Sequence, residues 1–216
     1  MNFSIEWLQL LTRVMADNLP AGIADVAYLV GETKDNADSV FAKGAELLED
    51  SRARIIAAQK GGDGFGYCGF QHSTEFLKAL GVCDKDIMGI EYQFEDFNDK
   101  VNTLTELINT VRFARDHGWR KLLLVAPHFH QLRSFITAVT AVDQEYPELK
   151  VYNCLGNRLD WNEPAVHSQG ALHATTRFDL IEGEMKRIVA YQKDGQPYPL
   201  VSVERALKYL KERDTT

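Results

Sequence analysis

Two histidines and an arginine stand close together in the segment Pro127-His128-Phe129-His130-Gln131-Leu132-Arg133, directly after the apolar run 121–126. An imidazole can bind a metal, hydrogen-bond a ligand or transfer a proton, and a guanidinium pairs with phosphate or carboxylate. If the segment is extended, His128 and His130 point to one side, as metal ligands must. No further ligand stands at a recognised spacing, so we expect no metal.

These side chains leave three interpretations open. We expect His130 and Arg133 to contact an anionic ligand, together with His128. The alternative is catalysis, with His130 as general acid–base and Arg133 as charge stabiliser, with or without a metal on His128 and His130. The third is a purely structural role.

A glycine-rich loop, 60–69, follows another apolar run, 54–59. Glycines let backbone N–H groups approach a ligand, which is often anionic. The stretch 64–69 also matches the GxGxxG pattern of dinucleotide sites, and Glu91 stands where a ribose-binding acid would be expected. However, the motif is separated from the strand, so the turn is not the tight one that a dinucleotide site needs. We therefore expect a ligand-lining loop, although glycines that serve shape alone are an alternative. The residues expected to face the ligand are those nearest the strand: Lys60, Gly61, Gly62 and Gly64.

Polar residues follow other predicted strands as well. Glu32 comes after the apolar run 25–30 and is a candidate ligand-binding residue. Asn102 or Thr103 can cap a helix, with Glu106 at capping-box distance from Thr103. Because the start of that helix lies at the same edge of the predicted sheet, we expect Asn102, Thr103 and Glu106 to position the ligand or to cap the helix.

The elements that carry these residues alternate regularly. Apolar runs are separated by amphipathic helical segments, which predicts an α/β fold: a three-layer, doubly wound, mainly parallel five-stranded sheet. In this arrangement ligands bind at the carboxyl ends of the strands. The predicted strands are 25–30, 54–59, 87–92, 121–126 and 150–155. The helices between them are 35–49, 73–80, 102–117 and 132–145.

Helical segments precede and follow this sheet. We expect residues 1–24 to form a helix that packs on the domain, 25–156 to form the Rossmann-like domain, and 157–216 to be a helical extension of the same domain.

Composition narrows the class of protein. The chain has 216 residues, 45% of them apolar, which suits one large domain. Its net charge of −7 argues against electrostatic binding of nucleic acid. Three widely spaced cysteines support neither a zinc ribbon nor a disulfide scaffold, and suggest a reducing, cytoplasmic setting. The sequence has no apolar run long enough to span a membrane and no signal-peptide pattern at its start.

Several short motifs, in their order, resemble the YdcF/SanA/ElyC-like family of bacterial proteins of unknown function. The matching stretches lie along most of the predicted sheet domain and in the tail: 60–64, Glu75, Asn102-Thr103 with Glu106, Phe129-His130-Gln131-Leu132-Arg133, and 178–195. Lys60 departs from the serine that is usual in the family. The resemblance implies a Rossmann-like fold with a pocket built from these loops. It also suggests a ligand of the S-adenosylmethionine type, and it implies no established reaction.

Our leading hypothesis is a protein that binds a small anionic, nucleotide-like molecule. The alternatives are a hydrolase or transferase that acts on a phosphorylated metabolite, and a non-catalytic interaction protein that uses its tail helices. The ligand's identity and the oligomeric state do not follow from the sequence.

Overall fold

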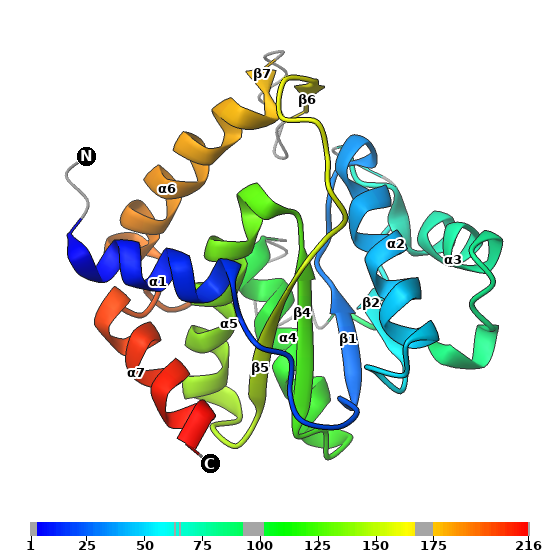
Figure 1. The fold of residues 1–216 in the computed structure, drawn as a ribbon, viewed down its shortest axis with the longest axis horizontal. Helices are drawn as coiled ribbons and strands as arrows, with labels where there is room; N and C mark the ends of the chain where they lie inside the picture. The colour runs from blue at the N-terminus through cyan, green and yellow to red at the C-terminus, as the bar shows by residue number, and fades with distance from the viewer. Residues whose placement is uncertain (1–3, 63, 65, 93–101, 167–174, 216) are drawn as a thin grey trace.

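The computed structural model describes residues 4–62, 64, 66–92, 102–166 and 175–215, and forms an α/β fold around a parallel sheet (Figure 1). The strand order is β3-β2-β1-β4-β5, and all neighbouring strands run parallel. This order reverses between β1 and β4, as in doubly wound Rossmann-like sheets, so the predicted fold class is confirmed. The strands are β1 (Val26–Leu29), β2 (Ile56–Gln59), β3 (Ile87–Ile90), β4 (Lys121–Ala126) and β5 (Lys150–Leu155).

Side chains that alternate along the strands pack into two apolar layers, one on each face of the sheet. Leu122 and Leu124 of β4 face α4 (Thr103–Asp116) and α5 (His128–Glu145), whereas Leu123 and Val125 face α2 (Lys34–Glu49) and α3 (Gly69–Ala79). Because side chains alternate along a strand, a continuously apolar strand such as β4 is buried on both faces. The sheet is therefore covered by helices on both sides, which leaves its carboxyl edge to form the site.

Three more helices pack outside α5: α1 (Ile5–Met15), α6 (Arg177–Asp194) and α7 (Val203–Thr215). Figure 1 shows them together on the side of the sheet opposite α2 and α3. The smaller elements are η1 (Asp84–Asp86) and a short antiparallel pair, β6 (Pro164–Ala165) and β7 (Thr175–Thr176). No helix in the described part of the chain is long and apolar enough to cross a membrane.

Two helices begin earlier than the sequence predicts. α3 starts at Gly69 rather than Ser73, and α5 starts at His128 rather than Leu132. Neither start has a side-chain cap, so the local signal of a helix start is missing there. The early start of α5 means that His128 and His130 lie on a helix, where residues two apart point in different directions. The extended geometry considered for a histidine pair is therefore not present.

Candidate functional site

The site lies where the strand order reverses, at the carboxyl ends of β1 and β4. The loop after β1 supplies Glu32, and the first turn of α5, directly after β4, supplies His130. The Glu32 carboxylate and His130 Nδ1 form a hydrogen bond, although the two residues are 98 positions apart in the chain. Both side chains are buried, at 7% and 6% exposure. The fold thus pairs two of the predicted site residues at the position where open α/β sheets bind ligands.

The other ring nitrogen of His130, Nε2, faces the interior of the site. It is buried and makes no hydrogen bond among the described residues. The closest carboxylate oxygen across the site, Glu184 Oε2, is 4.0 Å away, which is too far for a hydrogen bond. A carboxylate on Nδ1 favours the tautomer that keeps its proton there, which leaves the Nε2 lone pair free to accept one.

His130 lines a small cavity of about 20 Å³, here called the inner pocket, together with Glu32, Tyr67, Phe129, Arg133 and Glu184. A space of this size holds about one water molecule. The inner pocket is therefore small, lined by several charged side chains, and bordered by an imidazole whose Nε2 has no partner among the described residues.

The Arg133 guanidinium lines this pocket, and the Glu184 carboxylate neutralises its charge. Its Nε and Nη2 donate to the Glu184 carboxylate from α6, and its Nη1 donates to Thr103 Oγ1 at 2.8 Å. These bonds use three of the five N–H donors of a guanidinium, so two remain for another acceptor. The predicted residues Thr103 and Arg133 are thus brought together, with Glu184 as a partner that the sequence did not indicate.

Glu106 has a different role from the predicted capping partner of Thr103. Asn102 caps α4 instead, and Thr105 completes the capping box. Glu106 is buried beneath the loop after β1, where it accepts hydrogen bonds from Gly31 N at 2.8 Å and Tyr28 Oη at 2.7 Å. It therefore fixes the backbone from which Glu32 projects.

The pKa values of the buried carboxylates are shifted in different directions. Burial raises the pKa of Glu32 and outweighs the attraction of His130. Burial likewise raises the pKa of Glu106, against its bonds to Gly31 and Tyr28. Burial also opposes ionisation of Glu184, but the charges of Arg133 and His130 outweigh it and hold its pKa at about 2.

The glycine-rich loop contributes less to the site than predicted. Lys60 pairs with Glu91 at 2.6 Å on the surface, and the positions of Gly61 and Gly62 face open space. None of the four predicted loop residues (Lys60, Gly61, Gly62 and Gly64) lines either of the two cavities at the site. The loop follows β2 rather than β1, so it does not open onto the strand-order reversal where a dinucleotide loop belongs. Asp63 belongs to the stretch 60–64, which resembles a motif of the YdcF/SanA/ElyC-like family, and it lies outside the described residues.

The loop nevertheless reaches the site through one aromatic side chain. Gly66 O accepts from Lys34 N at 2.9 Å, and Tyr67 bridges to Thr33. This fold-back places Tyr67 on the wall of the inner pocket.

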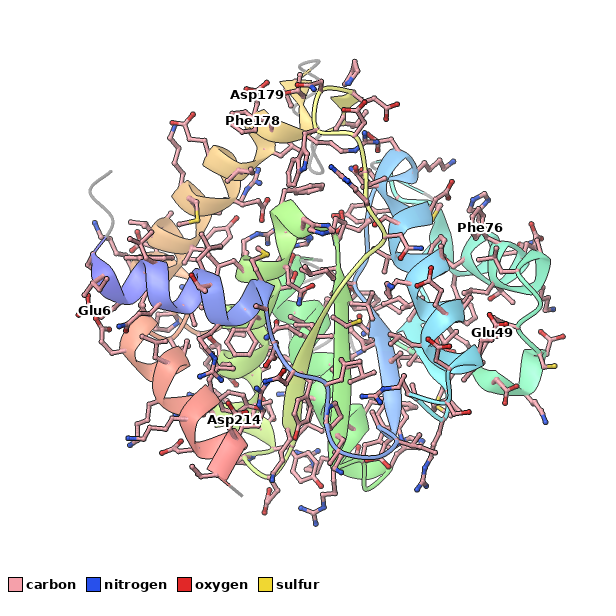
Figure 2. All side chains as sticks on the ribbon, viewed as in Figure 1. Glu6, Glu49, Phe76, Phe178, Asp179 and Asp214 are labelled. Carbon is pink, nitrogen blue, oxygen red and sulfur yellow. The ribbon has the colours of Figure 1, made fainter. Side chains whose placement is uncertain are left out.

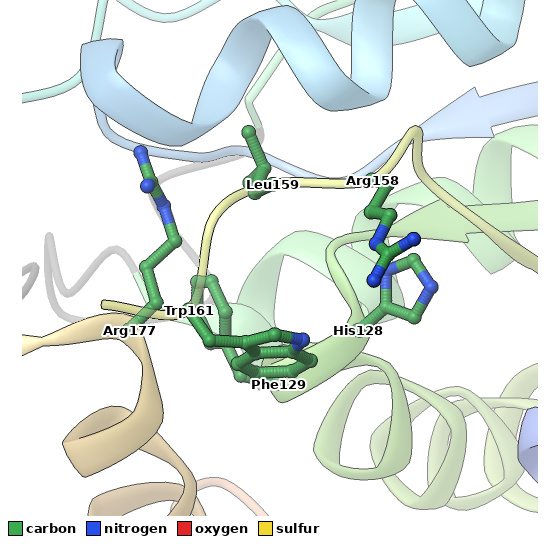
Figure 3. Close-up of a pocket in the computed structure, with 6 residues that line it drawn as sticks. All are labelled: His128, Phe129, Arg158, Leu159, Trp161 and Arg177. Atoms are coloured by element: carbon green, nitrogen blue, oxygen red, sulfur yellow. The ribbon is translucent and has the colours of Figure 1, made fainter. Parts of the chain in front are cut away.

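His128 faces a second cavity of about 130 Å³, here called the outer pocket, lined by His128, Phe129, Arg158, Leu159, Trp161 and Arg177 (Figure 3). Phe129 lines both pockets, so the two cavities adjoin. Among the described residues no group of three or more His, Cys, Asp or Glu side chains is placed to hold a metal.

No family model and no curated protein sequence matches this chain. Two solved structures with similarity to it are both pantothenate synthetases from Thermus thermophilus. Each is 13% identical and covers 94% of this chain and 79% of the other, with TM-scores of 0.41 and 0.42. At this identity and these TM-scores, the similarity gives no information about the ligand or the reaction of this chain.

The tail supplies the site residues that the sequence did not reveal. Glu184 lies on α6, and Arg158 and Trp161 lie in the segment between β5 and β6. Arg177 anchors this tail: its guanidinium binds Asn36 Oδ1 at 2.9 Å, Asp35 O at 2.8 Å and Glu163 at 2.6 Å. The only signal for these residues in the sequence was the group of polar and aromatic side chains after the fifth predicted strand. A segment in that place starts at the carboxyl edge of the sheet.

Replacing Glu184 with glutamine tests the charge balance of the inner pocket. We expect the free energy of unfolding to fall by about 2 kcal/mol near pH 7, because Arg133 loses its charged acceptor. Glu184 has a lowered folded pKa, so its contribution is full above the unfolded value of 4.5 and is lost as the pH falls towards 2. Urea unfolding at several pH values should therefore show the difference between variant and wild type shrinking on acidification.

The control lies on the same helix. Glu182 is 75% exposed and pairs with Lys186 on the surface, so Glu182→Gln should change stability little. An equal loss in both variants would contradict the assigned role of Glu184.

Proposed function

We propose that this chain is a YdcF-like enzyme, a hydrolase or transferase that acts on a small anionic, nucleotide-like or phosphorylated metabolite. One observation supports the proposal above all: His130 is oriented by Glu32 through Nδ1 and keeps a buried Nε2 without a partner among the described residues. A carboxylate that fixes an imidazole in this way prepares the other nitrogen for proton transfer.

The proton pathway follows from this arrangement. Nε2 takes a proton from a water molecule or from the hydroxyl group of an acceptor. As the proton leaves, the oxygen of that water or hydroxyl bonds to the substrate's phosphorus or carbonyl carbon. The bond to the leaving group then breaks, and the imidazolium returns the proton to the leaving group. Glu32 stabilises the imidazolium, and the two remaining N–H donors of Arg133 face the charge that develops on the substrate oxygen.

The charges of the inner pocket favour proton chemistry over tight anion binding. With every group ionised, the lining carboxylates Glu32 and Glu184 balance the lining cations Arg133 and His130, so the pocket offers an anion no net positive charge. The cavity of about 20 Å³ suits a single water molecule, the nucleophile of hydrolysis. Within this proposal the anionic part of the substrate therefore binds outside the inner pocket.

Binding without catalysis is the second candidate, with a ligand of the S-adenosylmethionine type included. It is supported by the outer pocket, which adjoins the predicted ligand-binding residue His128 and is bordered by aromatic side chains. The interaction-protein hypothesis has less support: among the described residues of α6 and α7, Phe178 is the one large apolar side chain that is well exposed (Figure 2).

A substrate panel separates the two candidates. We expect turnover with at least one phosphomonoester, phosphodiester or pyrophosphate substrate, while calorimetry measures binding of S-adenosylmethionine and nucleotides. Binding without any turnover would favour the second candidate and contradict the enzyme. Elemental analysis of the purified protein tests the metal-assisted form, which requires a stoichiometric metal.

A further inference from the structure

The outer pocket has a different electrostatic character from the inner pocket. Arg158 makes no ion pair or hydrogen bond among the described residues, and none of the side chains that line the pocket is a carboxylate. Arg177, across the pocket, is already neutralised by Glu163. Arg158 is therefore an uncompensated cation beside a cavity, within a chain whose overall charge is −7.

The imidazole of His128 is placed to assist that cation. Figure 3 shows it next to the Arg158 guanidinium, while the guanidinium of Arg177 turns towards α2. Partial burial first, and then the charge of Arg158, lower the pKa of His128. His128 is therefore neutral near pH 7 and can donate one hydrogen bond to an oxygen held by Arg158.

The remaining walls are apolar and flat. Trp161 and Phe129 border the cavity, and the His128 ring meets the Trp161 ring edge-on, with centroids 6.2 Å apart. The volume of about 130 Å³ is close to that of the roughly 150 Å³ engineered cavity that accepts benzene. The outer pocket thus has room for about one aromatic ring, and a ligand that also carries an acid group must extend beyond it.

We infer that the outer pocket is a recognition subsite for a substrate that carries both an anionic group, phosphate or carboxylate, and a planar ring. Arg158 and His128 bind the acid group, and Trp161 and Phe129 contact the ring. Because Phe129 also lines the inner pocket, the bound molecule extends past it towards His130. This orientation rests on the proposed function, whereas anion binding at Arg158 does not.

Titration calorimetry with three probes tests the subsite. Adenosine 5′-monophosphate presents a phosphate and a ring, benzoate presents a carboxylate and a ring, and adenosine lacks the acid group. We expect adenosine 5′-monophosphate or benzoate to bind more tightly than adenosine, and the tighter of the two identifies the acid. Arg158→Gln should weaken binding of that anion about 10- to 100-fold and leave adenosine unaffected.

A matched control variant and a fluorescence measurement show whether the probe binds in the outer pocket. Arg54→Gln, at an exposed arginine before β2, should bind every probe as the wild type does. Bound probe should quench tryptophan emission, and Trp161→Phe should remove most of that quenching. Equal binding of anion and adenosine, an unchanged affinity in Arg158→Gln, or no binding of any probe at millimolar concentration would overturn the subsite.

The same titration distinguishes this inference from the enzyme proposal. His130→Gln should bind the anionic probe as tightly as the wild type, because His130 is not part of the outer pocket. If Arg158 governs binding while His130→Gln keeps full turnover, the subsite stands and the mechanism fails. If His130→Gln loses turnover while Arg158→Gln keeps the wild-type KM, the mechanism stands and the subsite fails.

Discussion

Replacing His130 with glutamine is expected to lower kcat/KM by about 10²- to 10⁴-fold, the usual contribution of a positioned general acid–base. The glutamine can still hydrogen-bond Glu32 but cannot exchange protons at neutral pH. Steady-state kinetics on the substrate found in the panel measures the effect, with circular dichroism and thermal unfolding to confirm that the variant is folded. His72→Gln is the matched control, because His72 is exposed on α3, away from both pockets.

Glu32→Gln extends this test to the orientation of the imidazole. Glutamine can offer His130 Nδ1 an acceptor oxygen or a donor amide, so the tautomer is no longer fixed and the imidazolium loses its counter-charge. We expect a loss nearly as large as that of His130→Gln. The double variant should lose no more than the larger single one, because residues that act as one unit are not additive. Independent, additive losses would contradict a Glu32–His130 unit.

The arrangement of the sheet was predictable because its signals are local. The predicted bounds of β4 and β5 agree with the structure, since a turn residue, Pro127 or Gly156, directly follows each strand. The starts of α3 and α5 were not predictable, because Cys68 and Pro127 precede them in place of a capping side chain. Where a cap is present, as at Asn102 of α4, the sequence indicated the helix start well.

The candidate site was predictable residue by residue but not as a set of pairs. Glu32 and His130 were each identified because they follow a strand, but only the strand order brings their side chains together. Glu184 was missed because its position on α6 carries no local signal. Its function depends on how α6 packs against α5, 51 residues away from Arg133 in the chain. Long-range ion pairs of this kind leave no periodic pattern to read.

A second long-range ion pair joins the two ends of the chain and is invisible in the sequence for the same reason. Asp17, after α1, accepts from Arg213 Nη1 at 2.7 Å and Nη2 at 2.6 Å. It also accepts from the backbone N and side-chain Nδ2 of Asn153 on β5, both at 2.9 Å. The side chains of Arg213 and Asp17 are 2% and 1% exposed, and Figure 2 marks the adjacent Asp214 near the end of α7.

Asp17→Ala is therefore expected to lower the free energy of unfolding by about 3–5 kcal/mol, because it leaves a buried guanidinium without its principal counter-charge. For a chain of this length the midpoint of thermal unfolding should fall by about 6–20 °C, measurable by calorimetry. Arg13→Gln is the control, because the side chains of the Arg13–Asp214 pair are 48% and 36% exposed and such a surface pair contributes at most about 1 kcal/mol. Asp17→Leu combined with Arg213→Met should recover part of the loss, since an apolar pair leaves no buried charge. A loss below about 1 kcal/mol in Asp17→Ala would mean that apolar packing alone holds α1 and α7 against β5.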